Sequence, residues 1–284
     1  MRLCRFDGDR LGVVTGDVVR DVTAALDVLP ALRWPLPLED PLIARLDAVI
    51  DRIATLLDAA PVVRLVDVAL GSPVTSPSKI IGAPVNYRAH RDEIDDELRH
   101  GHAIKPISEW GLFLKASTAL CGPSDGVAQC FLDERTDHEV ELAVVIGRKG
   151  RDIPVDRALD HVAGYAIGLD ITLRGPQFQS FRKSIDSYAV LGPWLVTADE
   201  IADPSSLSLS LDVDGVRRQQ SDTSKLIYDV PRLIAYASEY YTLNPGDIIM
   251  TGTPDGVGPI RPGNILRAEI EGIGAMSVAV RRAA

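Results

Sequence analysis

Two glutamates, Glu139 and Glu141, stand one residue apart at the start of an apolar run that predicts a buried strand. Side chains alternate between the two faces of a strand, so these two point the same way, about 7 Å apart along the backbone. The glutamate face continues with Ala143 and Val145, and the opposite face is apolar as well. Buried carboxylates need a neutralising charge, which a hard divalent cation supplies. A solvated strand end that binds nothing is the open alternative for such a pair taken alone.

Asp170 is a third carboxylate in unusual surroundings, because it interrupts the otherwise apolar run 162–171. A buried strand aspartate needs a partner, and a cation shared with Glu139 and Glu141 would be one. An aspartate that ends a strand and caps a turn is the alternative. Three carboxylates with open water positions suit Mg²⁺ or Mn²⁺, whereas the chain offers no His/Cys set of the kind expected for zinc. The sequence therefore predicts one Mg²⁺ or Mn²⁺ ion per chain.

His90 and Glu93 lie three residues apart in a charged segment. On a helix they would share a face, and the carboxylate could orient the imidazole and raise its basicity. The alternative is a solvated helix, since residues 88–99 carry many charges of both signs.

Further polar residues in the second half could contact a ligand. Arg174, Gln177 and Lys183 follow Asp170 and could stabilise negative charge, although surface positions are the simpler interpretation. Residues 251–258 form a Gly-rich loop after a predicted strand. The spacing is not that of a dinucleotide site, so we interpret it as a tight turn that brings backbone and threonine hydroxyls to a ligand.

Composition describes an ordinary globular chain. Its 284 residues are 46% hydrophobic and 25% charged, enough for a substantial core. A net charge of −10 and the lack of any Lys/Arg-rich tract argue against nucleic acid and anionic membranes as partners. No apolar run approaches membrane-spanning length, the start does not resemble a signal peptide, and the three cysteines lack metal-site spacing. These features predict a cytoplasmic protein with reduced thiols.

The chain divides into two predicted parts. We expect a small N-terminal accessory domain over residues 1–72 and a larger, predominantly β, α+β domain over 73–284, separated by the Pro- and Ser-containing stretch 71–77. Alternation and periodicity predict short strands within 3–23 and at 112–115, 139–146, 207–213, 247–250 and 265–270, and helices at 42–57, 156–163 and 231–240.

The ordered set of motifs resembles the fumarylacetoacetate hydrolase family over about residues 78–281. The segments that carry the resemblance are 86–93, 112–115, 139–147, 164–170, 183–184, 191–194 and 245–258. The resemblance implies a mixed β-roll or sandwich fold, a homodimer, and a small N-terminal domain like that of many bacterial members. It also implies site residues: Glu139, Glu141 and Asp170 for the metal, His90 and Glu93 as the water-activating pair, Lys183 as a catalytic lysine, and Thr253, Lys115, Arg174 and Gln177 for the substrate.

Some positions depart from the family pattern. Gly175 follows Arg174 where aspartate is usual, and Ala116 follows Lys115 where proline is usual. Ala83 stands where larger members carry a fourth metal carboxylate, as in smaller members with three protein ligands. These departures leave the predicted metal site intact and leave the substrate's identity open.

Residue chemistry and resemblance together predict a metal-dependent hydrolase of C–C bonds in ketonic compounds. The substrate would be a 2-oxo acid such as an acylpyruvate or a related 1,3-diketo acid (fumarylpyruvate- or fumarylacetoacetate-like), of the kind met in aromatic catabolism, cleaved through a metal-stabilised enolate. The alternative within the family is a 2-oxo acid decarboxylase or isomerase, such as an oxaloacetate decarboxylase or a 2-hydroxyhepta-2,4-diene-1,7-dioate isomerase. From another class, a β-rich binding module without activity is the competing hypothesis.

Overall fold

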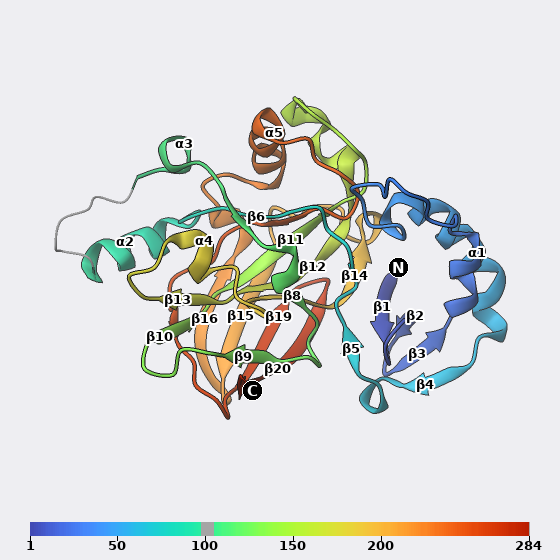
Figure 1. Cartoon of the computed structure of the whole chain (residues 1–284), viewed down its shortest axis with the longest axis horizontal. Coiled ribbons are helices and arrows are strands. Elements are labelled where there is room, and N and C mark those ends of the chain that lie inside the picture. Colours follow the sequence, from blue (N-terminus) through green and yellow to red (C-terminus); the bar gives the residue numbers. More distant parts are fainter. Residues whose placement is uncertain (98–104, 284) are drawn as a thin grey trace.

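The computed structural model of the chain describes residues 1–97 and 105–283, with the backbone alone for residues 93–97. Strands dominate, and a large mixed sheet runs through the molecule (Figure 1). Across this sheet the order is β4 (Val62–Arg64), β3 (Val18–Asp21), β2 (Arg10–Thr15), β1 (Arg2–Phe6), β14 (Ala189–Thr197), β12 (Val162–Asp170), β11 (Val140–Ile146), β17 (Ile248–Met250), β6 (Ile80–Gly82) and β7 (Phe113–Lys115). In addition, β5 (Leu70–Gly71) pairs with β1, and β8 (Leu120–Cys121) pairs with β14.

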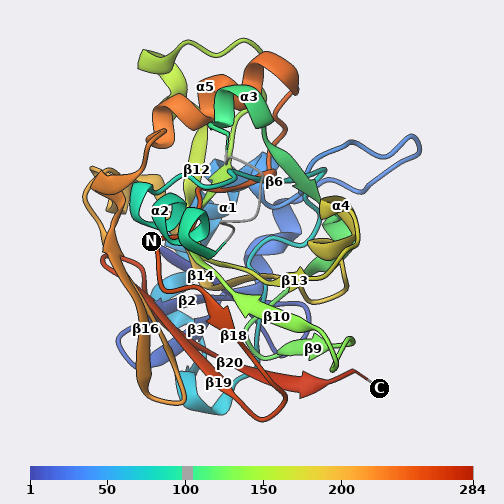
Figure 2. The ribbon, with the colours of Figure 1, turned by 90° about the vertical axis from the view of Figure 1, so that its left-hand side faces the viewer.

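Smaller sheets and short helices surround the large sheet. One sheet has the order β16 (Val216–Asp222), β15 (Ser208–Val213), β19 (Ile265–Ile270), β20 (Gly274–Arg282) and β9 (Val127–Gln129). Another joins β13 (Thr172–Arg174), β10 (Arg135–His138) and β18 (Gly258–Pro259). The α-helices are α1 (Leu46–Leu56), α2 (Arg88–Glu97), α3 (Ile107–Trp110), α4 (Gln179–Arg182) and α5 (Val230–Tyr240). Figure 2 shows α3 and α5 on one side of the sheets, with β19 and β20 on the other.

Both faces of β11 are buried, as its apolar sequence predicts. Ala143 and Val145 pack in a cluster with residues of α1 and of the N-terminal strands. Leu142 and Val144 face the other way, into a core shared with β15, β19 and β20. A strand covered on both faces cannot hydrate a charged side chain, so the carboxylates at its start depend on protein groups or ions for neutralisation.

The N-terminal strands extend the large sheet. β1 runs antiparallel to β14, with Arg2 opposite Val196 and Leu3 opposite Leu195. β2 pairs antiparallel with both β1 and β3, which confirms the hairpin strands predicted within residues 3–23. The predicted division between residues 72 and 73 stays a prediction, as does the cytoplasmic location. No helix within the described residues is long and apolar enough to cross a membrane.

The α+β, mostly β fold class is confirmed. The helix predicted at 42–57 is α-helical over Leu46–Leu56, and another predicted helix is wrong for a physical reason. Helix 156–163 was predicted, but residues Val155–His161 form a 3₁₀ helix and β12 begins at Val162. From there the chain is almost wholly buried between β11 and β14, and this pairing outweighs local helical periodicity. The helix predicted at 231–240 is confirmed as α5, whose first turn is capped by the Asp229 carboxylate.

Candidate active site

Three buried carboxylates meet where β11 begins and β12 ends. The two strands are antiparallel, with Val140 opposite Leu169, and the backbone N–H of Asp170 donates to the carbonyl of Glu139 at 2.9 Å. This register places Asp170 beside Glu139, while Glu141 lies on the same face two residues further along. One carboxylate oxygen from each side chain lies within 4.8 Å of the others. The predicted trio is therefore brought together.

Each glutamate has a different electrostatic environment. Burial raises the pKa of Glu139, but the charges of Lys183 and Arg174 outweigh it and hold this pKa below its usual range. Burial also raises the pKa of Glu141, and here the charges of Asp170 and Glu139 raise it further. The backbone N–H of Gly252 donates to Glu141 at 2.6 Å and opposes this rise. Crowded, buried carboxylate oxygens of this kind are suitable ligands for a hard divalent cation, whose charge would relieve the repulsion around Glu141.

Two lysines contact the same carboxylates. Lys115 is fully buried, and its ammonium group donates to the Asp170 carboxylate and to the backbone carbonyl of Ile171. Lys183 donates to Asp170 at 2.5 Å, to Glu139 at 3.1 Å and to the hydroxyl of Thr172 at 2.8 Å. Burial lowers the pKa of both lysines; the negative charges of Asp170 and Glu139 reverse this for Lys183, whose pKa is raised, but not for Lys115.

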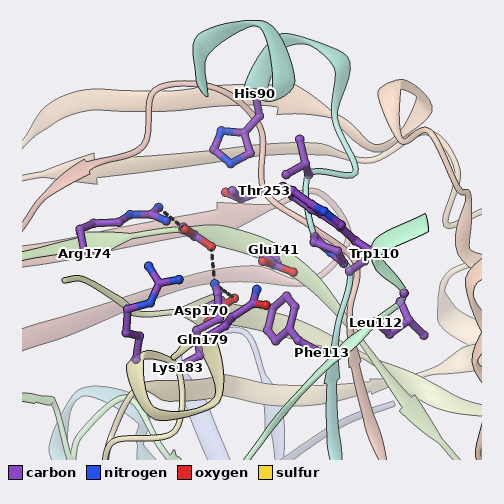
Figure 3. A pocket seen from close by; sticks show the side chains of 16 residues that line it. His90, Trp110, Leu112, Phe113, Glu141, Asp170, Arg174, Gln179, Lys183 and Thr253 are labelled. Atoms are coloured by element: carbon purple, nitrogen blue, oxygen red, sulfur yellow. Dashed lines mark hydrogen bonds and ion pairs between the residues drawn. The ribbon is translucent and has the colours of Figure 1, made fainter. Parts of the chain in front are cut away.

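The carboxylates form part of the wall of a cavity of about 470 Å³. His90 enters it from α2, and Figure 3 shows its imidazole extending toward the side chains of Glu141, Arg174 and Thr253. In the same view Trp110, Leu112 and Phe113 lie on the right, across from Arg174 on the left. Lys183 also contacts the ring of Phe113, with Nζ 4.7 Å from the ring centroid. The candidate base His90, the candidate cation site and an apolar wall thus line the same cavity.

The predicted substrate contacts are distributed unevenly. Arg174 lines the cavity, but its guanidinium already donates to Asp137 at 2.8 Å and to Glu139. Gln177 is not among the described residues that line the cavity, and its amide donates to Glu134 at 3.1 Å. Thr253 does line it. The side chain of Glu93 lies outside the described residues, so its pairing with His90 stays a prediction, as do the individual substrate contacts.

The sequence analysis missed Gln219, a fully buried residue of β16 that supports the site. Its amide oxygen accepts from the backbone N–H of Val140 at 3.1 Å, and its amide nitrogen donates to the hydroxyl of Thr253 at 2.8 Å and to the carbonyl of Pro254 at 2.9 Å. It therefore fixes the start of β11 relative to the 251–258 loop. No clear signal marks it in the sequence, because Gln219 and Gln220 stand side by side in β16 and only the folded structure shows which of them is buried.

The loop after β17 needs glycine at position 252. Gly252 has φ +102°, a conformation that side chains rarely allow. A Cβ atom there would lie 2.6 Å from Cβ of Asn86. The Asn86 amide in turn donates to the carbonyls of Thr251 and Tyr228, both at 2.8 Å. This close approach brings the Gly252 N–H to Glu141 and holds the segment preceding α2 against the loop.

Comparisons with known proteins agree with this geometry. The family model described as fumarylacetoacetate (FAA) hydrolase C-terminal matches residues 79–281. A maleylpyruvate hydrolase of Aquipseudomonas alcaligenes is 54% identical over 285 residues, covering 99% of both chains. A crystal structure of maleylpyruvate hydrolase from Sphingobium sp. SYK-6, in complex with manganese(II) and pyruvate, has a TM-score of 0.85 at 39% identity and covers both chains fully.

Another solved structure is a 5-carboxymethyl-2-hydroxymuconate delta-isomerase from Mycobacterium smegmatis, with a TM-score of 0.73 at 33% identity over the full length of both chains. The relatives thus include both a hydrolase and an isomerase, which matches the two functions left open by the sequence. The family model covers well over half of the chain, and the resemblance drawn from the motifs is confirmed. The chain belongs to the fumarylacetoacetate hydrolase family.

Proposed function

We propose that this protein is a metal-dependent hydrolase that cleaves the C–C bond of an acylpyruvate, with maleylpyruvate as its substrate. The observation that carries the proposal is the buried carboxylate trio in the wall of a cavity that also contains His90 and Lys183. Support comes from the 54% identical relative named maleylpyruvate hydrolase, and from a similar structure that holds manganese(II) and pyruvate.

Glu139, Glu141 and Asp170 would hold the cation, Mn²⁺ or Mg²⁺. When bound, the ion supplies Lewis-acid stabilisation of the negative charge that develops on the 2-oxo acid end of the substrate. Lys115 and Lys183 add positive charge to this cluster, because their ammonium groups contact the two carboxylate oxygens of Asp170. Ala83, which stands where larger family members carry a fourth metal carboxylate, lines the cavity and has no side-chain oxygen. The three carboxylates would therefore be the protein ligands.

His90 is the base that activates water. Its side chain is 5% exposed and lies in the cavity, so the imidazole can take a proton from a water molecule held there. The water oxygen bonds to the carbonyl carbon of the acyl group, and the C–C bond to the pyruvate fragment breaks. The electron pair of that bond stays with the pyruvate fragment, which takes up a proton, while the acyl group leaves as a carboxylic acid.

Lys183 stabilises the oxyanion formed when water adds. Its charge lies at the cavity wall against Phe113, where the low polarity strengthens electrostatic interactions. Its donors are shared among Glu139, Asp170 and Thr172, so contact with the oxyanion requires one of these hydrogen bonds to be exchanged.

The test is pyruvate release. Protein with Mn²⁺ is incubated with maleylpyruvate, fumarylpyruvate, acetylpyruvate and oxaloacetate, and pyruvate is followed with a coupled lactate dehydrogenase assay. We expect stoichiometric pyruvate and maleate from maleylpyruvate. Maleylpyruvate that isomerises without pyruvate release, or pyruvate from oxaloacetate alone, would support the isomerase or decarboxylase alternative and contradict the proposal.

The His90→Ala variant separates hydrolysis from that alternative. Removal of a general base should lower acylpyruvate cleavage by about 10²–10⁴-fold. Any oxaloacetate decarboxylation should fall much less, because that reaction needs no activated water. A parallel loss of both activities would show that His90 serves a step common to both reactions.

The homodimer and the cytoplasmic location are further proposals, and both rest on the family resemblance and on composition. Light scattering of the purified protein tests the first. A dimer of 30.7 kDa chains is the expected result.

A further inference from the structure

Arg182 ends α4 and lines the cavity next to Lys183, and it forms no ion pair with any residue that the structure describes. Its Nε is buried and has no hydrogen-bond partner. A guanidinium carries five N–H donors in a planar fork, and a buried donor without a partner costs free energy. A half-buried guanidinium at a cavity wall, with its Nε unsatisfied, can therefore bind an anion that enters the cavity.

The other cations at this cavity already have carboxylate partners. Arg174 is paired with Asp137 and Glu139, and Lys183 with Glu139 and Asp170. Within residues 1–97 and 105–283, Arg182 forms no ion pair. Burial lowers the pKa of Arg182, and the charge of Arg174 lowers it further against the opposing effect of Glu139. The local field around Arg182 thus favours an additional negative charge.

We propose that Arg182 binds the carboxylate at the far end of the acyl group, and so makes the enzyme selective for acylpyruvates whose acyl group ends in a carboxylate. This inference rests on the proposed function, because the 2-oxo acid end is assigned to the carboxylate trio. A guanidinium pairs with a carboxylate through two parallel hydrogen bonds, which recognise both its charge and its planar shape.

Different elements carry the trio and Arg182. The trio lies at the start of β11 and at the end of β12, whereas Arg182 ends α4. Trp110, Leu112 and Phe113 supply an apolar wall of the same cavity, which suits the hydrocarbon part of an acylpyruvate. A monocarboxylic acyl group would leave the buried Nε of Arg182 without a partner, and this is the physical origin of the selectivity.

Binding of two inert ligands tests the proposal without catalysis. 2-Oxopimelate has the chain length of maleylpyruvate and a distal carboxylate, and 2-oxoheptanoate has the same length with a methyl end. In calorimetry with Mn²⁺, we expect wild-type protein to bind 2-oxopimelate roughly 10- to 100-fold more tightly, the usual effect of a charged, bidentate hydrogen-bonded pair. Arg182→Gln should abolish this preference, and Arg182→Lys should keep part of it.

Arg157→Gln is the matched control, because Arg157 is an exposed arginine paired with Asp160 away from the cavity and its loss should leave the preference unchanged. Equal weakening of both ligands in Arg182→Gln would show that Arg182 holds the 2-oxo acid end, and would overturn the proposal. Wild-type protein without a preference would overturn it as well. Should Arg182→Gln fail to fold, as judged by circular dichroism, a full wild-type preference in Arg182→Lys would count against a bidentate contact.

Kinetics distinguish this inference from the proposed reaction. We expect Arg182→Gln to lower kcat/KM for maleylpyruvate by roughly 10- to 100-fold and to change kcat/KM for acetylpyruvate less than about threefold. A wild-type protein that prefers 2-oxopimelate but releases no pyruvate from either substrate would contradict the hydrolase and leave the Arg182 site standing. Equal losses with the two substrates would contradict the selectivity.

Discussion

Two regions of the molecule bury carboxylates, and they treat them in opposite ways. One is the segment before α1, which contains Asp40. One oxygen of Asp40 accepts from the backbone N–H groups of Leu42 and Ile43, and the other accepts from the backbone N–H and hydroxyl of Thr75, at the junction with residues 75–76. Asp247 is similarly satisfied, because Lys79 donates to one of its oxygens from the backbone N–H at 3.0 Å and to the other from Nζ at 2.5 Å.

In the cavity the three carboxylates lie close to one another, and one of them, Glu141, is short of donors. Glu141 receives the Gly252 N–H but lies beside Asp170 and Glu139, whose charges raise its pKa. A buried carboxylate that only stabilises a fold is surrounded by donors, whereas Glu141 is held beside two like charges at a cost to the isolated protein. The comparison identifies the carboxylates that serve a ligand, and variants of the two regions should behave oppositely.

The largest expected effect is on activity in the cavity. Glu141→Gln should lower acylpyruvate cleavage by roughly 10³-fold or more, because a neutral amide binds a divalent cation poorly and the Lewis-acid contribution is lost. The free energy of unfolding without metal should stay the same or rise, since a like charge is removed. Denaturant unfolding and pyruvate release on the same preparation check both parts. A loss of stability as large as the loss expected for Asp40→Asn would contradict the contrast.

Asp40→Asn should have the reverse profile. An amide cannot accept from all the N–H groups around it, so the free energy of unfolding should fall by about 2–4 kcal/mol. Activity measured well below the unfolding midpoint should stay within about twofold of wild type, because Asp40 does not line the cavity. Guanidinium chloride unfolding followed by circular dichroism measures the first quantity. Full stability in this variant would show that the junction is not held by this carboxylate.

A smaller effect is expected on thermal stability, where added Mn²⁺ should distinguish variants of the two regions. Added Mn²⁺ should stabilise wild-type protein by about 2.7 kcal/mol at a hundredfold excess over Kd, a shift of a few degrees in Tm. Asp40→Asn should show the same shift from its lower starting Tm, whereas Glu141→Gln should show almost none. Differential scanning fluorimetry with and without Mn²⁺ provides the measurement. Equal shifts in Glu141→Gln and wild type would place the metal elsewhere.

Much of the site could be predicted because its signal is local. Glu139 and Glu141 share a face by strand alternation, and Asp170 stands at the end of an apolar run, so their types and spacing indicate burial before any contact is known. The strands β11, β15, β17 and β19 were predictable for the same reason. Strand β14 was not, because Gly192 and Pro193 interrupt its pattern although both lie in the sheet.

The parts that were missed depend on residues distant in sequence. Gln219 acts on Val140 and Thr253 from a different sheet, and no local periodicity encodes that contact. Nothing in the sequence distinguishes Arg182 from a surface arginine next to Lys183. Its importance follows from the burial of Nε and from the pairing of Arg174 with Asp137 and Glu139, which only the folded arrangement shows.

The most direct test of the central claim is a Mn²⁺ titration of metal-stripped wild-type protein, with ion binding by calorimetry and pyruvate release from maleylpyruvate measured in parallel. The account predicts no turnover after exhaustive chelation, one ion bound per chain, and activity that rises in proportion to bound Mn²⁺. Full pyruvate release from the stripped protein, or activity that saturates without any bound ion, would contradict it.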